Sequence, residues 1–395
     1  MTPAARGPSR DLVLLLSGAN FVIGMGAFLV IGALPPIARG LDLSPAQAGW
    51  ILTTYALAYA LLSPVLVSLT GAVGRRRVMA AGMALFALGA VGTALAPSLG
   101  ALLAARVVAA AGAGLTTPVT AAVAAALAPP EARGRVLALV FLGLTVSGVL
   151  GVPAGAWIAY ALGWRAAFWT VAGLTALATA LLWVRIPQGL RFQPVTFGDL
   201  REVLGDARLM LAIAFTAVFL GAIYVPYTFL APLLEARMGL GRDGVTAALA
   251  VCGVGAVAGN LAGGWLADRL GAVRTLLAVA LGQVALMPLL SALPMPLPLA
   301  FALLLVWNAV GFAFNAAQQS RLVALAGPRT PVALALNAAC IYLGAALGSA
   351  VGAGVIEGAG IGAIGAAGGV AGLLAVGHVL LSNRLSPVDA APPRP

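Results

Sequence analysis

Charged residues are scarce in this sequence. They make up 8% of its 395 residues, whereas soluble domains carry roughly 25%, and hydrophobic residues make up 62%. This composition, with a mean hydropathy of +1.06, excludes a water-soluble globule and indicates an integral membrane protein. Lysine is absent altogether. A Walker A loop needs a lysine to reach the nucleotide phosphates, so ATP hydrolysis by that route is excluded as well.

Cysteine and histidine are nearly absent too. Cys252 and Cys340 fall inside apolar runs, where buried thiols are expected rather than a disulfide or a metal pair, and His378 is the single histidine. The apolar runs contain no paired carboxylates and no set of serine, histidine and acid. The sequence therefore predicts neither an enzyme nor a metal site.

The apolar residues form runs long enough to cross a membrane, which takes about 20 residues in a helix. We expect a bundle of six spans at 1–185, a polar linker at 186–208, a second bundle at 209–383 and a disordered tail at 384–395. The predicted spans are 12–34, 48–70, 77–97, 99–127, 136–161, 165–185, 209–233, 245–267, 273–293, 298–320, 331–355 and 359–382.

Arginine supplies every basic residue and gives the chain a formal net charge of +11. The arginines are scattered between the apolar runs, which favours topology determinants over nucleic-acid binding. With twelve spans, one alternate set of loops and termini carries 17 arginines and the other carries 4, which leaves Arg106 inside a span. Because arginine concentrates on the cytoplasmic side of membranes, we predict that both termini are cytoplasmic.

The fifth span contains a glycine-rich segment with a proline. Gly148, Gly151 and Gly155 surround Pro153, which removes a backbone hydrogen bond in the middle of a helix. The freed carbonyl must be satisfied by a neighbour or by water. We expect a bend here, and either a flexible hinge or a static kink would fit the residues.

A charged turn occurs twice, with Gly74 and Gly271 at matching positions 197 residues apart. A motif repeated at half the chain length indicates two similar halves. The stronger copy, Gly264-Trp-Leu-Ala-Asp-Arg-Leu-Gly271, resembles the signature loop of the major facilitator superfamily, Gly-x-Leu-Ala-Asp-Arg-x-Gly. The weaker copy keeps Leu69 and the Arg75–Arg77 cluster, but has Gly71 in place of the aspartate. Further similarities lie at Arg106, 131–135, 148–155 and 163–168.

This resemblance implies an all-α integral membrane protein with twelve transmembrane helices in two pseudo-symmetric six-helix bundles. Within the superfamily, the chain is similar to the twelve-helix drug:proton antiporters, in particular the sugar- and nucleoside-efflux-like branch. The resemblance further implies a monomer in the bacterial inner (plasma) membrane. Its partners would be the lipid bilayer and a small-molecule substrate, with no nucleic acid and no cofactor, and a proton gradient would supply the energy.

The resemblance also implies that the signature loops form a conformational gate. An aspartate there can accept hydrogen bonds from a helix N-terminus and pair with an arginine when the cytoplasmic ends of the bundles close. A solvated charge pair with little effect is the alternative. The weaker copy lacks the aspartate, so we do not expect it to gate in the same way. The residues carried over are Gly264, Asp268, Arg269, Gly271 and Arg274, with Gly74, Arg75 and Arg76 in the weaker copy.

Polar side chains inside the spans indicate where a substrate would bind. One face of the tenth span carries three of them, together with Phe312, at helical spacing, and one face of the fourth span carries Arg106 and Thr117. We expect the two faces to meet across a central cavity. Packing is the alternative for the tyrosines, and a contact with backbone carbonyls is the alternative for Arg106. The cavity candidates are Asn20, Tyr55, Tyr59, Arg106, Thr117, Tyr224, Tyr227, Asn308, Phe312, Asn315, Gln319 and Asn337.

The acidic residues all fall in loops, tails or span ends, so the residues alone identify no carboxylate for proton coupling. Glu235 and Glu357 are the nearest candidates. The working hypothesis is an alternating-access exporter, coupled to protons, for a sugar, a nucleoside or another small polar compound or drug. Uptake or uniport by the same fold is one alternative, and a non-transporting membrane receptor or scaffold is another.

Overall fold

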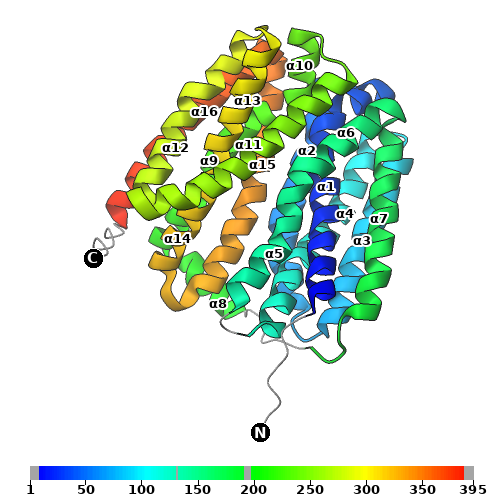
Figure 1. The fold of residues 1–395 in the computed structure, drawn as a ribbon, viewed down its shortest axis with the longest axis vertical. Coiled ribbons are helices and arrows are strands. Elements are labelled where there is room, and N and C mark those ends of the chain that lie inside the picture. Colours follow the sequence, from blue (N-terminus) through cyan, green and yellow to red (C-terminus); the bar gives the residue numbers. More distant parts are fainter. Residues whose placement is uncertain (1–8, 130–131, 191–196, 387–395) are drawn as a thin grey trace.

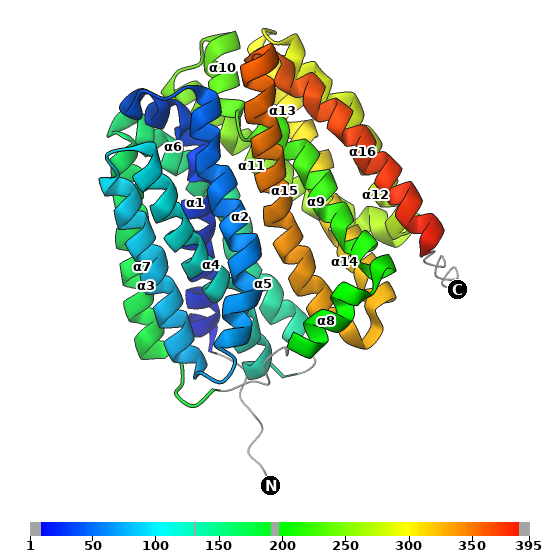
Figure 2. The ribbon, with the colours of Figure 1, turned by 180° about the vertical axis from the view of Figure 1, so that it is seen from behind.

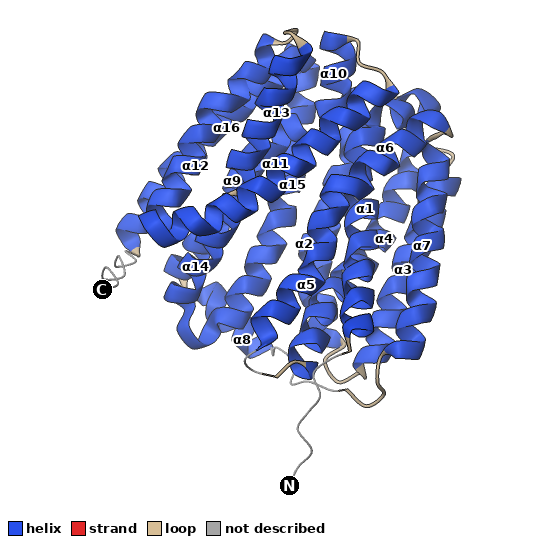
Figure 3. Ribbon diagram, viewed as in Figure 1, coloured by secondary structure: helices blue, strands red, loops and turns tan. Residues whose placement is uncertain are grey.

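The computed structural model describes residues 9–129, 132–190 and 197–386, and every regular element in these ranges is a helix (Figure 3). The first half of the chain forms six spans. The fifth of them is continuous through a π-helical turn, η2. The elements are α1 (Arg10–Leu41), α2 (Pro45–Leu69), α3 (Arg75–Leu95), α4 (Leu99–Leu127), α5 (Arg133–Val146) with η2 (Ser147–Gly151) and α6 (Val152–Ala161), and α7 (Trp164–Arg185).

The second half repeats this order after a short linker helix, α8 (Phe197–Gly205). Several of its spans consist of two helical pieces. The elements are α9 (Ala207–Tyr227) with α10 (Leu230–Met238), α11 (Arg242–Leu270), α12 (Ala272–Leu286) with η3 (Met287–Ala292), α13 (Leu297–Phe312) with α14 (Phe314–Ala326), η4 (Gly327–Arg329), α15 (Thr330–Ala359), η5 (Ile361–Ala363) and α16 (Ile364–Leu385).

Twelve spans follow from these elements. Eleven helical stretches in the described ranges are long and apolar enough to cross a membrane, and one of them, Leu297–Ala359, has 63 residues. A straight helix of that length would extend roughly 95 Å, about three times the hydrocarbon thickness. The chain turns within it at Gly327, where φ is 52°, so this stretch contains two spans. The predicted all-α fold with twelve spans is confirmed.

Some predicted boundaries are wrong in detail. The first helix runs from Arg10 to Leu41 rather than over 12–34, and its residues from Leu34 to Ala38 are still buried in the protein. The seventh span breaks after Tyr227 and the tenth after Phe312. Residue 384, predicted to begin the tail, is still in α16. The rest of the predicted tail from residue 387 lies outside the described residues, and the exact domain boundaries stay a prediction.

The two halves lie side by side, and both run the full height of the molecule (Figures 1 and 2). We call the end where α1 begins and α16 finishes the terminal end, and the opposite end the distal end. The seam is the interface between the halves, where α2 packs along α15 and the fifth span packs against α11. Since a central transport path would follow this seam, its contacts decide where a solute could pass.

The fifth span is irregular where the sequence predicted a bend. Ser147–Gly151 form a π-helical turn, and Pro153 follows at the start of α6. Gly151 and Gly155 bring the span close to Met25 and Leu29 of α1, since a β-carbon at either glycine would lie within 3.0 Å of those side chains. The π-helical turn supplies the irregularity that proline requires. Whether it also flexes stays a prediction.

Candidate functional site

Aromatic side chains from both halves meet at the middle of the seam. Tyr59 of α2 and Tyr342 of α15 stack with ring centroids 3.6 Å apart and an interplanar angle of 23°. Tyr55, one turn earlier on α2, lies 6.4 Å from the Tyr342 ring. Phe28 of α1 lies 6.0 Å from Tyr342 and 6.3 Å from Tyr224 of α9. Ring pairs at such distances attract each other, so these five residues, which we call the aromatic bridge, join the two halves.

Arg106 lies beside the aromatic bridge and is buried within the first half. Its Nη1 donates to the Gly26 carbonyl at 2.8 Å and its Nη2 donates to the Ala27 carbonyl at 2.9 Å. Its guanidinium lies 4.2 Å from the centroid of the Tyr55 ring. Thr117, further along α4, is buried as well. The structure thus shows the carbonyl contacts that were the alternative for Arg106, and a part in solute binding stays a prediction.

The predicted polar face of the tenth span becomes more exposed along its length. Asn308 is buried, Phe312 and Asn315 are half-buried, and Gln319 is exposed. Asn315 donates to the Asn260 side-chain oxygen of α11 at 3.3 Å. Amide groups are costly to place against lipid. The exposure of this polar face therefore increases toward the terminal end.

Two predicted cavity residues instead lie inside one half each. Asn20 donates to the Thr120 hydroxyl at 3.2 Å and to the Val140 carbonyl at 3.1 Å, which joins α1 to α4 and α5. Asn337 accepts from the Thr216 hydroxyl at 2.6 Å, which joins α15 to α9. Neither amide lines an open crevice in this structure, because each is used to hold neighbouring helices of its own half together.

The seam is closed at the distal end by polar contacts. Arg39 at the end of α1 pairs with Glu235 of α10 at 3.0 Å, and the Tyr160 hydroxyl of α6 donates to the same carboxylate at 2.6 Å. Within the described ranges this is the only ion pair that joins one half to the other. Ser349 of α15 also donates to the Gly49 carbonyl of α2 at 2.9 Å. The two halves are therefore tied together on this side of the aromatic bridge.

Comparison with known proteins agrees with this arrangement. The profile of the Major Facilitator Superfamily matches residues 16–349. The chain belongs to this superfamily. The inner membrane transport protein YdhP of Escherichia coli O157:H7 is 32% identical over 379 residues, which cover 95% of this chain and 96% of YdhP. A chloramphenicol resistance protein of Streptomyces lividans is 32% identical over 346 residues, covering 86% of this chain and 87% of that protein.

Solved structures support the same fold. A bacterial homologue of the human lysosomal transporter Spinster, in an inward-facing and unoccupied conformation, superimposes with a TM-score of 0.77 at 19% identity, over 97% of this chain and 98% of that one. The protein is thus a multi-pass membrane transporter of the major facilitator superfamily rather than an enzyme.

The intact superfamily motif lies at the terminal end, where it forms the end of α11, and Gly271 separates α11 from α12. Asp268 and Arg269 are exposed, and the Arg269 guanidinium lies 4.2 Å from the Trp265 ring. Gly271 has φ of 81°, a backbone conformation that favours glycine. Gly264 is half-buried and Arg274 is exposed. In this structure the Asp268 carboxylate makes no ion pair with a described residue, so its gating role stays a prediction.

The weaker loop of the first half is bound to the linker. The Arg75 backbone N–H donates to the Leu190 carbonyl at 3.1 Å, and the Arg76 guanidinium lies 4.5 Å from the Trp183 ring of α7. Gly74 is half-buried and precedes α3. The two copies of the superfamily motif therefore have different surroundings, although they occupy matching positions in the two halves.

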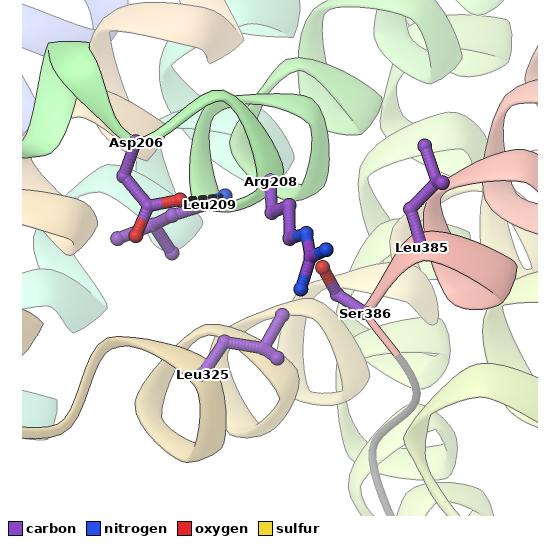
Figure 4. Close-up of a pocket in the computed structure, with 6 residues that line it drawn as sticks. All are labelled: Asp206, Arg208, Leu209, Leu325, Leu385 and Ser386. Atoms are coloured by element: carbon purple, nitrogen blue, oxygen red, sulfur yellow. Dashed lines mark hydrogen bonds between the residues drawn. The ribbon is translucent and has the colours of Figure 1, made fainter.

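A pocket of about 310 Å³ lies at the terminal end of the second half, away from the aromatic bridge (Figure 4). Asp206 caps α9 there by accepting from the Leu209 backbone N–H at 3.0 Å, and Arg329 pairs with it at 2.9 Å. The Leu209 hydrogen bond and the Arg329 charge hold the pKa of the Asp206 carboxyl below its ordinary value. Arg208, Leu325, Leu385 and Ser386 complete the lining.

Sequence reasoning missed two members of the aromatic bridge, Phe28 and Tyr342. Tyr342 lies inside a span, as do Tyr55 and Tyr59, so the same criterion of an intramembrane tyrosine would have found it. Phe28 carried no such signal, because it is one of 13 phenylalanines in an apolar chain. Tyr227 was predicted, and it packs edge-on against Tyr224 and Trp307 within the second half.

Proposed function

We propose that this protein is a secondary active exporter that works by alternating access, with its terminal end in the cytoplasm. The observation that supports this proposal is the unequal seam. Its distal end is held shut by the Arg39–Glu235 pair, while the polar face of α13 and α14 becomes exposed toward the terminal end. The arginine-rich loops lie at the terminal end, which favours a cytoplasmic location and hence an inward-facing conformation in a bacterial inner membrane.

The solute in this proposal is a small polar compound or drug, with a sugar or a nucleoside as examples. The residues around the seam offer amides, hydroxyls and aromatic rings, and the described spans place no carboxylate at mid-depth. That surface suits a neutral or weakly anionic solute better than a lipophilic cation. The chloramphenicol resistance of a relative supports export of a drug-sized molecule.

Proton antiport is the proposed source of energy, and Glu235 is the carboxylate best placed to respond to protons. It forms an ion pair with Arg39 of α1 and accepts a hydrogen bond from Tyr160 of α6, so both partners belong to the opposite half. The neighbouring α11 contributes Arg242, which is already paired with Asp243 at 2.7 Å. Protonation of Glu235 from the distal side would remove the charge that holds the seam shut, and would favour opening there.

Reconstituted liposomes containing a pH-sensitive dye test this proposal. Sugars, nucleosides and phenicol drugs are added to one side, and a change of internal pH that depends on the protein is the expected result. Glu235→Gln should weaken the dependence of exchange on pH, while Asp42→Asn, which alters an exposed acid at the same end, after α1, serves as the matched control. Solute exchange that is unaffected by collapse of the proton gradient would exclude antiport.

Counterflow distinguishes transport from the remaining alternatives. A receptor or scaffold would exchange no solute at all. An uptake transporter or uniporter would exchange solute, but it would not accumulate solute against a gradient inside inverted vesicles, whose lumen corresponds to the outside of the cell.

A further inference from the structure

We propose that the Tyr59–Tyr342 stack is the substrate slot, and that it selects solutes containing a planar, unsaturated ring. This inference rests on the proposed transport function and assigns a substrate class to the seam. In the proposed slot, the solute's ring inserts between the two tyrosine rings, so that two ring–ring contacts replace one tyrosine–tyrosine contact.

The first argument is the placement of the two rings. Tyr59 belongs to the first half and Tyr342 to the second, and both are buried at the middle of the seam with centroids 3.6 Å apart. Insertion of one ring requires the tyrosines to separate by about 3.5 Å, the thickness of an aromatic ring. A small rocking of one half against the other supplies such a movement, so the width of the slot follows the motion of the bundles.

The second argument is an unused hydrogen-bonding group beside the stack. Tyr55 is 0% exposed, and its hydroxyl has no hydrogen-bond partner among the described residues. Buried hydroxyls in proteins are normally paired, so an unpaired one at this position suggests a polar group supplied by a ligand. The Nε of Arg106, whose guanidinium lies 4.2 Å from the centroid of the Tyr55 ring, is buried and unpaired in the same way. A carbonyl or hydroxyl on the edge of the solute's ring would satisfy the Tyr55 hydroxyl.

The requirement for a planar solute ring follows from the geometry of the slot. A flat ring makes full contact with both tyrosine faces, as bases do on aromatic side chains. A saturated ring is puckered and presents hydrogen atoms above and below its plane, so it needs a wider slot and loses the contact of π-systems.

Matched pairs of solutes that differ only in ring planarity test the proposal. Uridine is compared with 5,6-dihydrouridine, and phenyl β-glucoside with cyclohexyl β-glucoside. Binding to the purified full-length protein in detergent is measured by thermal stabilisation, which requires no transport. We expect the planar member of at least one pair to bind about tenfold more tightly than its saturated partner.

Variants show whether the preference arises at the stack. Tyr59→Leu and Tyr342→Leu should each abolish it, and Tyr59→Phe should retain it because the ring is kept. Phe141→Leu, which alters an exposed aromatic of α5, is the matched control and should also retain it. Size-exclusion chromatography identifies any variant that fails to fold, and the other leucine variant then decides.

The results separate this proposal from the one on which it rests. Three outcomes would overturn the slot. They are equal binding of both members in both pairs, failure of both planar members to bind, and a preference that survives both leucine variants. Transport of saturated solutes in liposomes would then leave the exporter proposal standing. Planar selectivity without solute exchange would support the slot and contradict the exporter.

Discussion

The seam between the halves and the contact between α11 and α13 are both long helix–helix interfaces, but they are built differently. Within the second half, Gly255, Gly259 and Gly263 of α11 lie against successive backbone carbonyls of α13 and its junction with α14. A β-carbon at any of these three glycines would collide with that backbone. Between the halves, the backbones approach closely where Gly253 of α11 lies against Gly148 and Val149 of the fifth span. The other contacts described above depend on side chains, chiefly the aromatic bridge and the Arg39–Glu235 pair.

This difference separates the parts that stay together from the parts that can move. Backbones in direct contact gain dense packing over the whole helix length, which is the main source of helix association in a membrane. Ring stacks and a partly exposed ion pair are each weak interactions, and rotation of a few side chains can break them and form other contacts. We therefore expect substitutions at backbone contacts within a half to lower stability strongly, and substitutions of these seam side chains to shift conformation with little loss of stability.

The largest expected effect is that of Gly259→Ala. The added methyl group would strike the Ala309 backbone carbonyl, and overpacking of this kind costs about 1–3 kcal/mol or more. Gly264→Ala on the same helix is the control, because its β-carbon would lie 4.0 Å from Ala316, an ordinary contact. Thermal unfolding in detergent should show a clear decrease in melting temperature for Gly259→Ala alone. Equal melting of both variants would contradict the distinction between the two interfaces.

Arg106→Ala should have the next largest effect, since Arg106 ties α4 to α1 within the first half. The variant removes two charge-assisted hydrogen bonds to buried carbonyls and should lower the free energy of unfolding by about 2–3 kcal/mol. Arg106→Lys retains the charge and places its N–H donors on one nitrogen instead of two, so it should recover part of the loss. Full stability of the alanine variant in the same melting assay would show that these bonds do not hold the half together.

Asp206→Ala should cost about 1 kcal/mol, the usual effect of losing a helix N-cap. The carboxylate has a depressed pKa in the folded protein. Its contribution is therefore present above the ordinary pKa of an aspartate, and it is lost as the pH falls through the depressed value. Melting curves of the wild type and the variant should converge at acidic pH. A difference that persists unchanged there would point to a cause other than the charge.

Arg39→Ala should have the smallest effect on stability, below about 1 kcal/mol, because the Arg39 side chain is 60% exposed and the pair is screened by solvent. It should instead favour opening of the distal end. In a Cys252→Ser, Cys340→Ser background, a cysteine placed at the buried Ser349 should react faster with a membrane-impermeant maleimide when Arg39 is replaced. An unchanged labelling rate would show that the ion pair does not hold the seam shut.

The sequence alone determined the membrane class, the twelve spans and the two similar halves. Hydrophobic run length and repeated motifs are local properties of a chain in a bilayer, where every backbone group must be satisfied within its own helix. The irregular fifth span was predicted for the same reason, since Pro153 removes a backbone hydrogen bond from its own helix.

Only the tertiary structure decided which polar residues face the seam. Asn20, Asn308 and Asn337 look alike in sequence, yet Asn20 and Asn337 bond to neighbouring helices of their own halves, and Asn308 donates to the Leu304 carbonyl of its own helix at 3.0 Å. The sequence could not decide this, because rotation and pairing of helices depend on contacts far apart in the chain. The stack of Tyr59 on Tyr342 likewise joins residues 283 positions apart. Such partners are set by the packing of two bundles, and helical periodicity within one span carries no information about them.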